Sequence, residues 1–303
     1  MVPSLVTSSL SHSLGSVVGD VRRSIGDNIF ARVAGPDGPV RHERIHGSTG
    51  PRWFEEGAVI RRVHGDASMF VGGIRALLLQ SLHPHAMAGV MDHSGFEGDP
   101  WGRLQRTSYF LAVTTFGTAR DAEQMVAAVR RVHETVVGKA PDGRPYAASD
   151  PHLLRWVHVA EIDSFLTAHQ RWGRAPLDAE GRDTYVAQTA RVAEALGVDD
   201  PPRSEAELAE QLAAYRPELE GTPAARRTAR FLLLNPPLPL PARVPYGGLA
   251  AAAVGLMPVW ARRELLLPYL PLTERLLVRT TGSALTKTIR WAMTASPPPR
   301  QPA

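Results

Sequence analysis

Histidine, arginine and threonine side chains recur along an apolar stretch between Asp66 and His158, where they are well placed to do chemistry. A polar group on an apolar helix face costs free energy unless a partner satisfies it. A buried anionic cofactor that also carries a metal would satisfy many of these groups at once. The side chains are Arg75, His83, His85, Arg103, Arg106, Thr107, His133 and His158.

His133 is the first candidate metal ligand. It lies in a segment, residues 119–137, whose valines recur at helical spacing. Thr118 and Asp121 form a capping box at the start of this segment, and Gly138 provides a stop. Because a neutral imidazole on an apolar wall suits haem iron, His133 is predicted to be a proximal haem ligand. The alternative is a core histidine bonded to a backbone carbonyl.

His158 is a rival ligand on the helix predicted to start at Asp150-Pro151. Glu161 lies one turn further on, so the pair could be half of a dinuclear carboxylate site. Such sites use Glu-x-x-His motifs from two helices, and the only such motif here runs from Glu43 to His46. We therefore expect His158 to support cofactor binding or to belong to the core.

The string His42-Glu43-Arg44-Ile45-His46 matches the HExxH motif of zinc proteases. That motif works when a helix places both histidines on one face with the glutamate as general base. Here the segment follows a turn, and residues 47–51 would stop a helix at once. A solvent-exposed polar stretch is the favoured interpretation.

Two further histidine motifs predict local structure rather than chemistry. His83 and His85 flank Pro84 at a kinked helix end, and two ligands there do not make a metal site. We expect a helix-end contact instead. Asp92 and His93 are expected to lie in a turn.

Arg103, Arg106, Thr107 and Phe110 share one face of a helix predicted over residues 100–116. Two arginines and a threonine could anchor haem propionates or donate to an oxygen ligand. The alternative is a solvated arginine face with a threonine bonded to its own helix.

Helical periodicity predicts a single all-α domain at residues 41–295, after a partly helical extension at 1–40 and before a disordered tail at 296–303. Strand patterns are nearly absent, and residues 235–248 are expected to be extended because they are rich in proline. The other helices are predicted at 67–82 with Asp66 as N-cap, from residue 151 onward, and at 176–196, 204–216, 222–234, 248–268 and 271–292. Asp99-Pro100 marks the start of the helix at 100–116, and Ser204 with Glu207 forms a capping box for the helix at 204–216.

Composition narrows the possible functions. The 303 residues include no cysteine, which excludes disulfides and thiolate-held metals or clusters. The net charge is +4 without any block of basic residues, so nucleic-acid binding is disfavoured. No apolar run reaches the roughly 18 residues that a spanning helix needs. We expect a cytoplasmic protein, with peripheral membrane contact left open and no indication of oligomeric state.

Taken in order, six motifs resemble the family of MpaB oxygenases and latex-clearing rubber oxygenases, closely over roughly residues 60–170 and more loosely over the proline-rich and apolar C-terminal segments. They are Arg75-Ala-Leu-Leu-Leu-Gln-Ser-Leu-His-Pro, Asp92-His-Ser, Arg103-x-x-Arg106-Thr107, Phe116-Gly-Thr, Val129-Arg-Arg-Val-His133 and Trp156-Val-His158. The resemblance implies a globin-like all-α fold that binds a b-type haem through one proximal histidine. It also implies cleavage of isoprenoid double bonds with dioxygen.

The resemblance places His133 as the proximal ligand and Arg103, Arg106 and Thr107 on the distal side. We expect catalytic roles for these three distal residues, and cofactor contacts for Arg103, Arg106 and His158. Arg106 stands where the rubber enzymes have lysine. Because a guanidinium does not lose its proton, Arg106 should not ligate the iron, and we expect an open or water-bound sixth position. A proton-handling carboxylate near the haem is also implied, and no acidic residue beyond the cap Asp66 lies on the 67–82 helix.

The leading hypothesis is therefore a haem b oxygenase that acts on a hydrophobic substrate, such as an isoprenoid or alkene, with dioxygen. Residues 77–79 and Phe110 would line the substrate pocket, and Arg103 would hold a propionate. Peroxidase or peroxygenase chemistry at the same iron is an alternative, because a distal arginine favours heterolysis of a peroxide. A non-catalytic haem sensor and a haem-free helical scaffold are the remaining alternatives.

Overall fold

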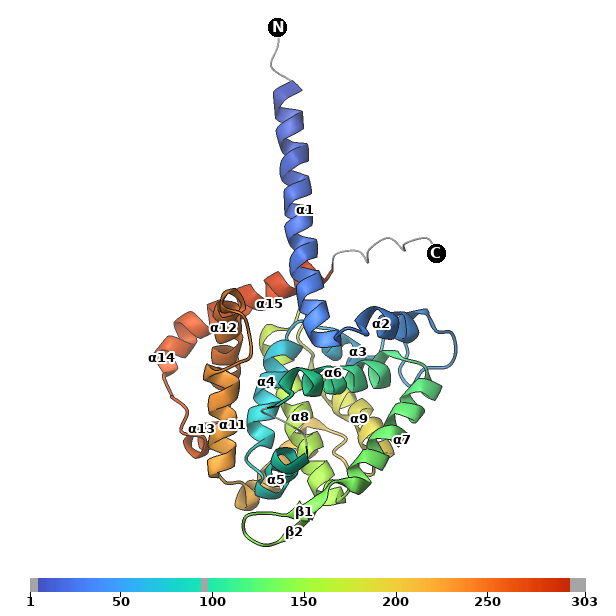
Figure 1. Cartoon of the computed structure of the whole chain (residues 1–303), viewed down its shortest axis with the longest axis vertical. Helices are drawn as coiled ribbons and strands as arrows, with labels where there is room; N and C mark the ends of the chain where they lie inside the picture. Colours follow the sequence, from blue (N-terminus) through green and yellow to red (C-terminus); the bar gives the residue numbers. More distant parts are fainter. Residues whose placement is uncertain (1–4, 94–97, 295–303) are drawn as a thin grey trace.

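The computed structural model describes residues 5–93 and 98–294 and is almost entirely helical (Figure 1). This confirms the predicted all-α class. The strands of the described part are β1 (Val137–Lys139) and β2 (Pro145–Ala147), an antiparallel hairpin that pairs Gly138 with Tyr146. The helices are α1 (Leu5–Ala34), α2 (Gly38–Gly47), α3 (Val59–His64), α4 (Met69–Gln80), α5 (Pro84–His93), α6 (Pro100–Phe116), α7 (Ala119–Thr135), α8 (Pro151–Trp172), α9 (Ala179–Leu196), α10 (Glu205–Ala214), η1 (Arg216–Glu218), α11 (Pro223–Leu234), α12 (Leu240–Leu256), α13 (Val259–Glu264), α14 (Pro271–Thr273), η2 (Glu274–Val278) and α15 (Arg279–Met293).

The centre of the fold is the contact between α4 and α8, which lie beside each other in Figure 1. Gly72 on α4 makes the close approach possible, since a Cβ there would lie 2.9 Å from Cδ1 of Phe165 on α8. Leu78 and Leu79 of α4 and Trp156 of α8 are fully enclosed in the same core. Gly72 therefore lets α4 pack directly against α8.

Helices α6 and α7 meet at a corner and then diverge across the face of α8 and α9 (Figure 1). The predicted caps fix both starts: Asp99 accepts from the Gly102 amide at 2.9 Å, and Thr118 accepts from the Asp121 amide at 3.2 Å. Helix α7 ends at Thr135, two residues earlier than predicted, because the next residues pair in the β hairpin.

Two local predictions were wrong. The proline-rich segment expected to be extended instead begins α12 at Leu240. Pro241 occupies the first turn, where its missing N–H has no helical partner, and Pro245 removes only one further hydrogen bond. Asp92 and His93, expected in a loop turn, belong to the end of helix α5. Asp92 accepts a hydrogen bond from the Tyr146 hydroxyl at 2.6 Å.

Helix α1 extends away from the rest of the molecule, and its C-terminal part packs against α6 and α15 (Figure 1). Arg22 donates to the Trp291 carbonyl at 2.8 Å, and Gln105 donates to the Arg32 carbonyl at 3.3 Å. The N-terminal extension is thus a helix that docks by one end. The predicted tail at 296–303 lies outside the described residues. None of the described helices has the length and hydropathy to cross a membrane.

Candidate functional site

The Arg75 side chain finds its partners within the protein, so the prediction that a cofactor satisfies it was wrong. Arg75 is 3% exposed on α4 and forms an ion pair with Asp163 at 2.7 Å. It also donates to the Ser164 hydroxyl at 2.7 Å and to the Leu256 carbonyl at 3.0 Å. The close packing of α4 on α8 brings these groups together, so Arg75 stabilises the core.

His133 lies in the last turn of α7 and is half-buried. Its Nδ1 is enclosed and has no hydrogen-bond partner among the described residues. Burial lowers the pKa of His133, so the ring is neutral at neutral pH. The valine face around it is less enclosed than predicted, since Val132 is 59% exposed. Among the described residues, no backbone carbonyl accepts a hydrogen bond from the His133 ring, so the alternative of a carbonyl-bonded core histidine is not observed.

His158 is more deeply enclosed, on α8. Its Nε2 is buried without a hydrogen-bond partner in the described parts of the chain, and burial lowers its pKa to about 4. Glu161, one turn further along α8, keeps part of its accessible surface, but burial raises its pKa to about 7. Helix α8 therefore presents a neutral imidazole and a carboxyl group that titrates near neutral pH.

A chain of polar groups next to Glu161 was not found by sequence reasoning. His64 on α3 lies 2.8 Å through Nδ1 from the Thr115 hydroxyl and 3.2 Å through Nε2 from the Tyr185 hydroxyl. Burial lowers the pKa of His64 to about 3. Burial, followed by the charges of Glu161 and Asp163, raises the pKa of Tyr185. The sequence carries no motif that joins these residues, because they come from four separate helices.

The predicted distal residues share a face of α6, as their spacing indicates, but their surroundings differ. Burial and the charge of Arg106 lower the pKa of Arg103 to about 10. Arg106 is 64% exposed, and its Nη1 lies 3.2 Å from Oδ2 of the helix cap Asp99. Thr107 is exposed. Within the described residues, no hydrogen bond or ion pair joins Arg106 or Thr107 to His133.

The HExxH string lies on the ten-residue helix α2, which ends at Gly47, where the sequence predicts a stop. Pro39, in the first turn, starts this helix before the motif. The rings of His42 and His46 lie 4.5 Å apart between centroids. The group of described residues that could hold a metal lies elsewhere, so α2 offers no third ligand.

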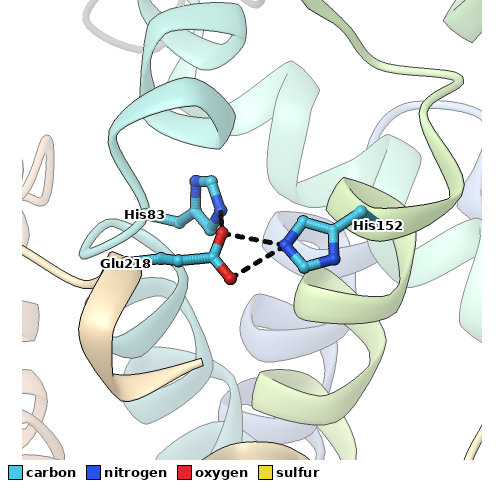
Figure 2. A group of neighbouring side chains, drawn as sticks. All are labelled: His83, His152 and Glu218. Atoms are coloured by element: carbon cyan, nitrogen blue, oxygen red, sulfur yellow. Dashed lines mark hydrogen bonds and ion pairs between the residues drawn. The ribbon is translucent and has the colours of Figure 1, made fainter. Parts of the chain in front are cut away.

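That group consists of His83, His152 and Glu218, which come from three distant parts of the chain (Figure 2). The sequence singled out His83 and His85 together. The structure leaves their rings 5.8 Å apart between centroids but gives them different partners: His85 lies 3.3 Å from the Asp142 carboxylate, and His83 faces Glu218.

Two of the three leucines expected near the substrate pocket belong to the core. Leu78 and Leu79 are fully buried in the core formed with α8 and α12, so the face they occupy is closed. Two surface hollows of the described part lie on either side of Trp53, and His133 lines neither of them. Phe110 is half-buried on α6.

Comparison with protein families gives a match over residues 61–291, to the model described as "ER-bound oxygenase mpaB/B'/Rubber oxygenase, catalytic domain". The chain belongs to this family. The predicted resemblance is therefore confirmed, and it extends across the C-terminal helices, beyond the segment that the motifs cover. No similar protein was found among curated proteins, and no similar chain among solved structures. Membership of this family makes the protein an oxidoreductase of the oxygenase type. The matched region contains every predicted site residue.

Proposed function

We propose that the protein is a haem b-dependent oxygenase that acts on a hydrophobic substrate with dioxygen, and that His133 is the proximal ligand of the iron. The observation that carries the proposal is the His133 ring, which has an enclosed Nδ1 and no protein partner among the described residues. A buried polar atom without a partner costs free energy, so such atoms in a native protein point to a missing ligand.

The chemistry of this ring fits haem. Iron is bound by a neutral imidazole, and burial lowers the pKa of His133 so that the ring is neutral. His158 supplies a second neutral imidazole, with an unpartnered Nε2, as the competing ligand. Haem, when bound, supplies the activation of dioxygen that oxygenase chemistry requires.

Glu161 is the proposed proton-handling carboxylate. A group whose pKa lies near the working pH both accepts and releases protons readily, and burial raises the pKa of Glu161 to about 7. Its charge acts on Tyr185, whose hydroxyl lies 3.2 Å from His64 Nε2. The three groups offer a path for a proton between the interior of the protein and α3.

Arg103 and Arg106 have different proposed tasks. Arg103 is a largely buried cation on α6, and a guanidinium of this kind suits a haem propionate because it can bind a carboxylate through two hydrogen bonds. Arg106 and Thr107 keep the proposed role of donors to an oxygen ligand. For this, Arg106 must leave the carboxylate of Asp99, which now lies 3.2 Å away. That pairing gives no support to the peroxidase alternative, which needs a distal arginine aimed at the iron.

The proposal is tested by expression with added haem, followed by a visible spectrum and a pyridine haemochrome assay. The wild type should show a Soret band, His133→Ala should lose it, and His158→Ala should keep most of it. His42→Ala, on the exposed face of α2, is the matched control and should bind haem normally. A colourless wild type, or a band that survives His133→Ala, would reject the proposal.

Activity assays distinguish an oxygenase from a peroxidase and from a non-catalytic sensor. Oxygen uptake that depends on an added isoprenoid alkene supports the oxygenase. Peroxide-driven oxidation of a dye without such uptake would support a peroxidase, and tight oxygen binding with neither activity would support a sensor.

A further inference from the structure

We propose that His83, His152 and Glu218 form a binding site for one divalent first-row transition-metal ion, such as Zn²⁺ or Fe²⁺, separate from the proposed haem ligand. One ligand atom from each residue lies within 4.8 Å of the other two. Two imidazoles and a carboxylate are the ligand set of many catalytic zinc and non-haem iron sites, which keep further positions for water or substrate.

The distances are close to those that an ion requires. Nε2 of His83 lies 3.4 Å from Oε2 of Glu218, and Nε2 of His152 lies 2.8 Å from the same oxygen. Ligands about 2.1 Å from a tetrahedral zinc lie about 3.4 Å from one another. Only small side-chain rotations are therefore needed to place an ion among the three groups, which point toward one another in Figure 2.

His83 gives the independent sign of a missing ligand. It is 3% exposed and faces the cluster, its Nδ1 has no hydrogen-bond partner among the described residues, and its Nε2 has only the 3.4 Å contact with Glu218. Burial lowers its pKa, against the opposing charge of Glu218, so the ring is the neutral form that binds metals. His152 and Glu218 are partly exposed, which leaves an ion a path from solvent.

The surroundings orient the ligands. The Tyr215 hydroxyl donates to the His152 carbonyl at 2.8 Å and lies 3.4 Å from His152 Nδ1. The hydroxyl oxygen can accept the Nδ1 proton, which leaves the Nε2 lone pair directed at the cluster, as outer groups do in metal sites. The backbone is also held, because the Glu220 amide donates to the Leu82 carbonyl at 2.8 Å.

The site is distinct from the proposed haem region. His152 and His158 both lie on α8, but their positions differ by about 120° around the helix axis, so they face different neighbours. The cluster joins the segment between α4 and α5, the first turn of α8 and the end of η1. A bound ion would tie three parts of the fold together.

The test is isothermal titration of the full-length protein, as purified and after dialysis against a chelator, with Zn²⁺ and separately with Fe²⁺ under anaerobic conditions. The expected result is one ion per chain. Glu218→Gln and His152→Gln should each weaken binding at least tenfold, because each removes a direct ligand. His42→Gln, which alters the other close histidine pair, should bind as the wild type does.

Circular dichroism establishes that the variants are folded, and X-ray absorption of the zinc-loaded protein should show two imidazole ligands. The absence of binding to the wild type would overturn the proposal and leave a histidine–glutamate hydrogen bond. Equal affinity in Glu218→Gln would also overturn it, because the ion would then lie elsewhere. Neither result depends on whether the protein binds haem.

Discussion

Replacing Glu161 with glutamine should stabilise the haem-free protein at high pH and leave its stability unchanged at low pH. The pKa of this carboxyl group is raised by burial from 4.5 to about 7 in the folded protein. Below pH 4.5 the group is protonated in both the folded and unfolded states, so it has no effect on their balance. As the pH rises from 4.5 through about 7, the unfolded chain ionises first and the folded state loses stability.

The size of this loss follows from the shift. A pKa shift of one unit corresponds to about 1.4 kcal/mol. The shift of Glu161 from 4.5 to about 7 therefore lowers the free energy of unfolding by at most about 3 kcal/mol. Glu161 keeps part of its accessible surface, and solvent screening reduces the limit to about 1–3 kcal/mol. Glutamine has nearly the same shape and no charge, so Glu161→Gln should recover this amount above pH 7.

Urea unfolding of both proteins at pH 4.5, 6 and 8 measures the effect. Glu210→Gln, on the exposed face of α10, controls for the loss of one negative charge. The free-energy difference should be near zero at pH 4.5 and reach its full size at pH 8. A variant less stable than the wild type at pH 8, or a difference that stays constant with pH, would refute the burial of this carboxylate.

Three further changes test other parts of the structure. Thr118→Ala should cost about 1 kcal/mol in urea unfolding because α7 loses its cap, and Thr118→Ser should restore most of it; no loss would contradict the cap. Arg75→Met should cost about 3–5 kcal/mol by leaving Asp163 without its partner, and Arg75→Met with Asp163→Leu should recover part of that cost. Arg106→Lys should give the haem-loaded protein an alkaline spectral transition that the wild type lacks, because only an amine can deprotonate and ligate iron; identical spectra would argue against a distal position for residue 106.

Local signals in the sequence predicted much of the fold. The caps at Asp99, Thr118, Asp150 and Ser204 were identified correctly because each depends on residues that are adjacent in the chain. The predicted cap Asp66 was wrong: α4 begins at Met69 after Ser68, and Asp66 instead forms an ion pair with Arg290 at 2.9 Å. The start of α12 was missed because two prolines outweighed the helical pattern around them, although Pro241 occupies a position where proline is tolerated. Local preference gave way there to tertiary packing.

The candidate site was harder to predict because its groups depend on long-range contacts. The sequence showed that Arg75 needed a partner, but only the packing of α4 on α8 revealed that Asp163 provides it. Likewise, nothing in the spacing of His152 and Glu218 indicates that they meet His83. The assignment of haem to His133 stays a prediction, supported by the family match and by an imidazole without a partner among the described residues.

Chemical rescue of His133→Gly tests the central claim most directly. If this imidazole binds the iron, the variant should lack the Soret band of the wild type and regain it when free imidazole fills the space left by the side chain. The same treatment of His158→Gly should change the spectrum little. A full Soret band in His133→Gly without added imidazole would contradict the assignment, as would rescue confined to His158→Gly.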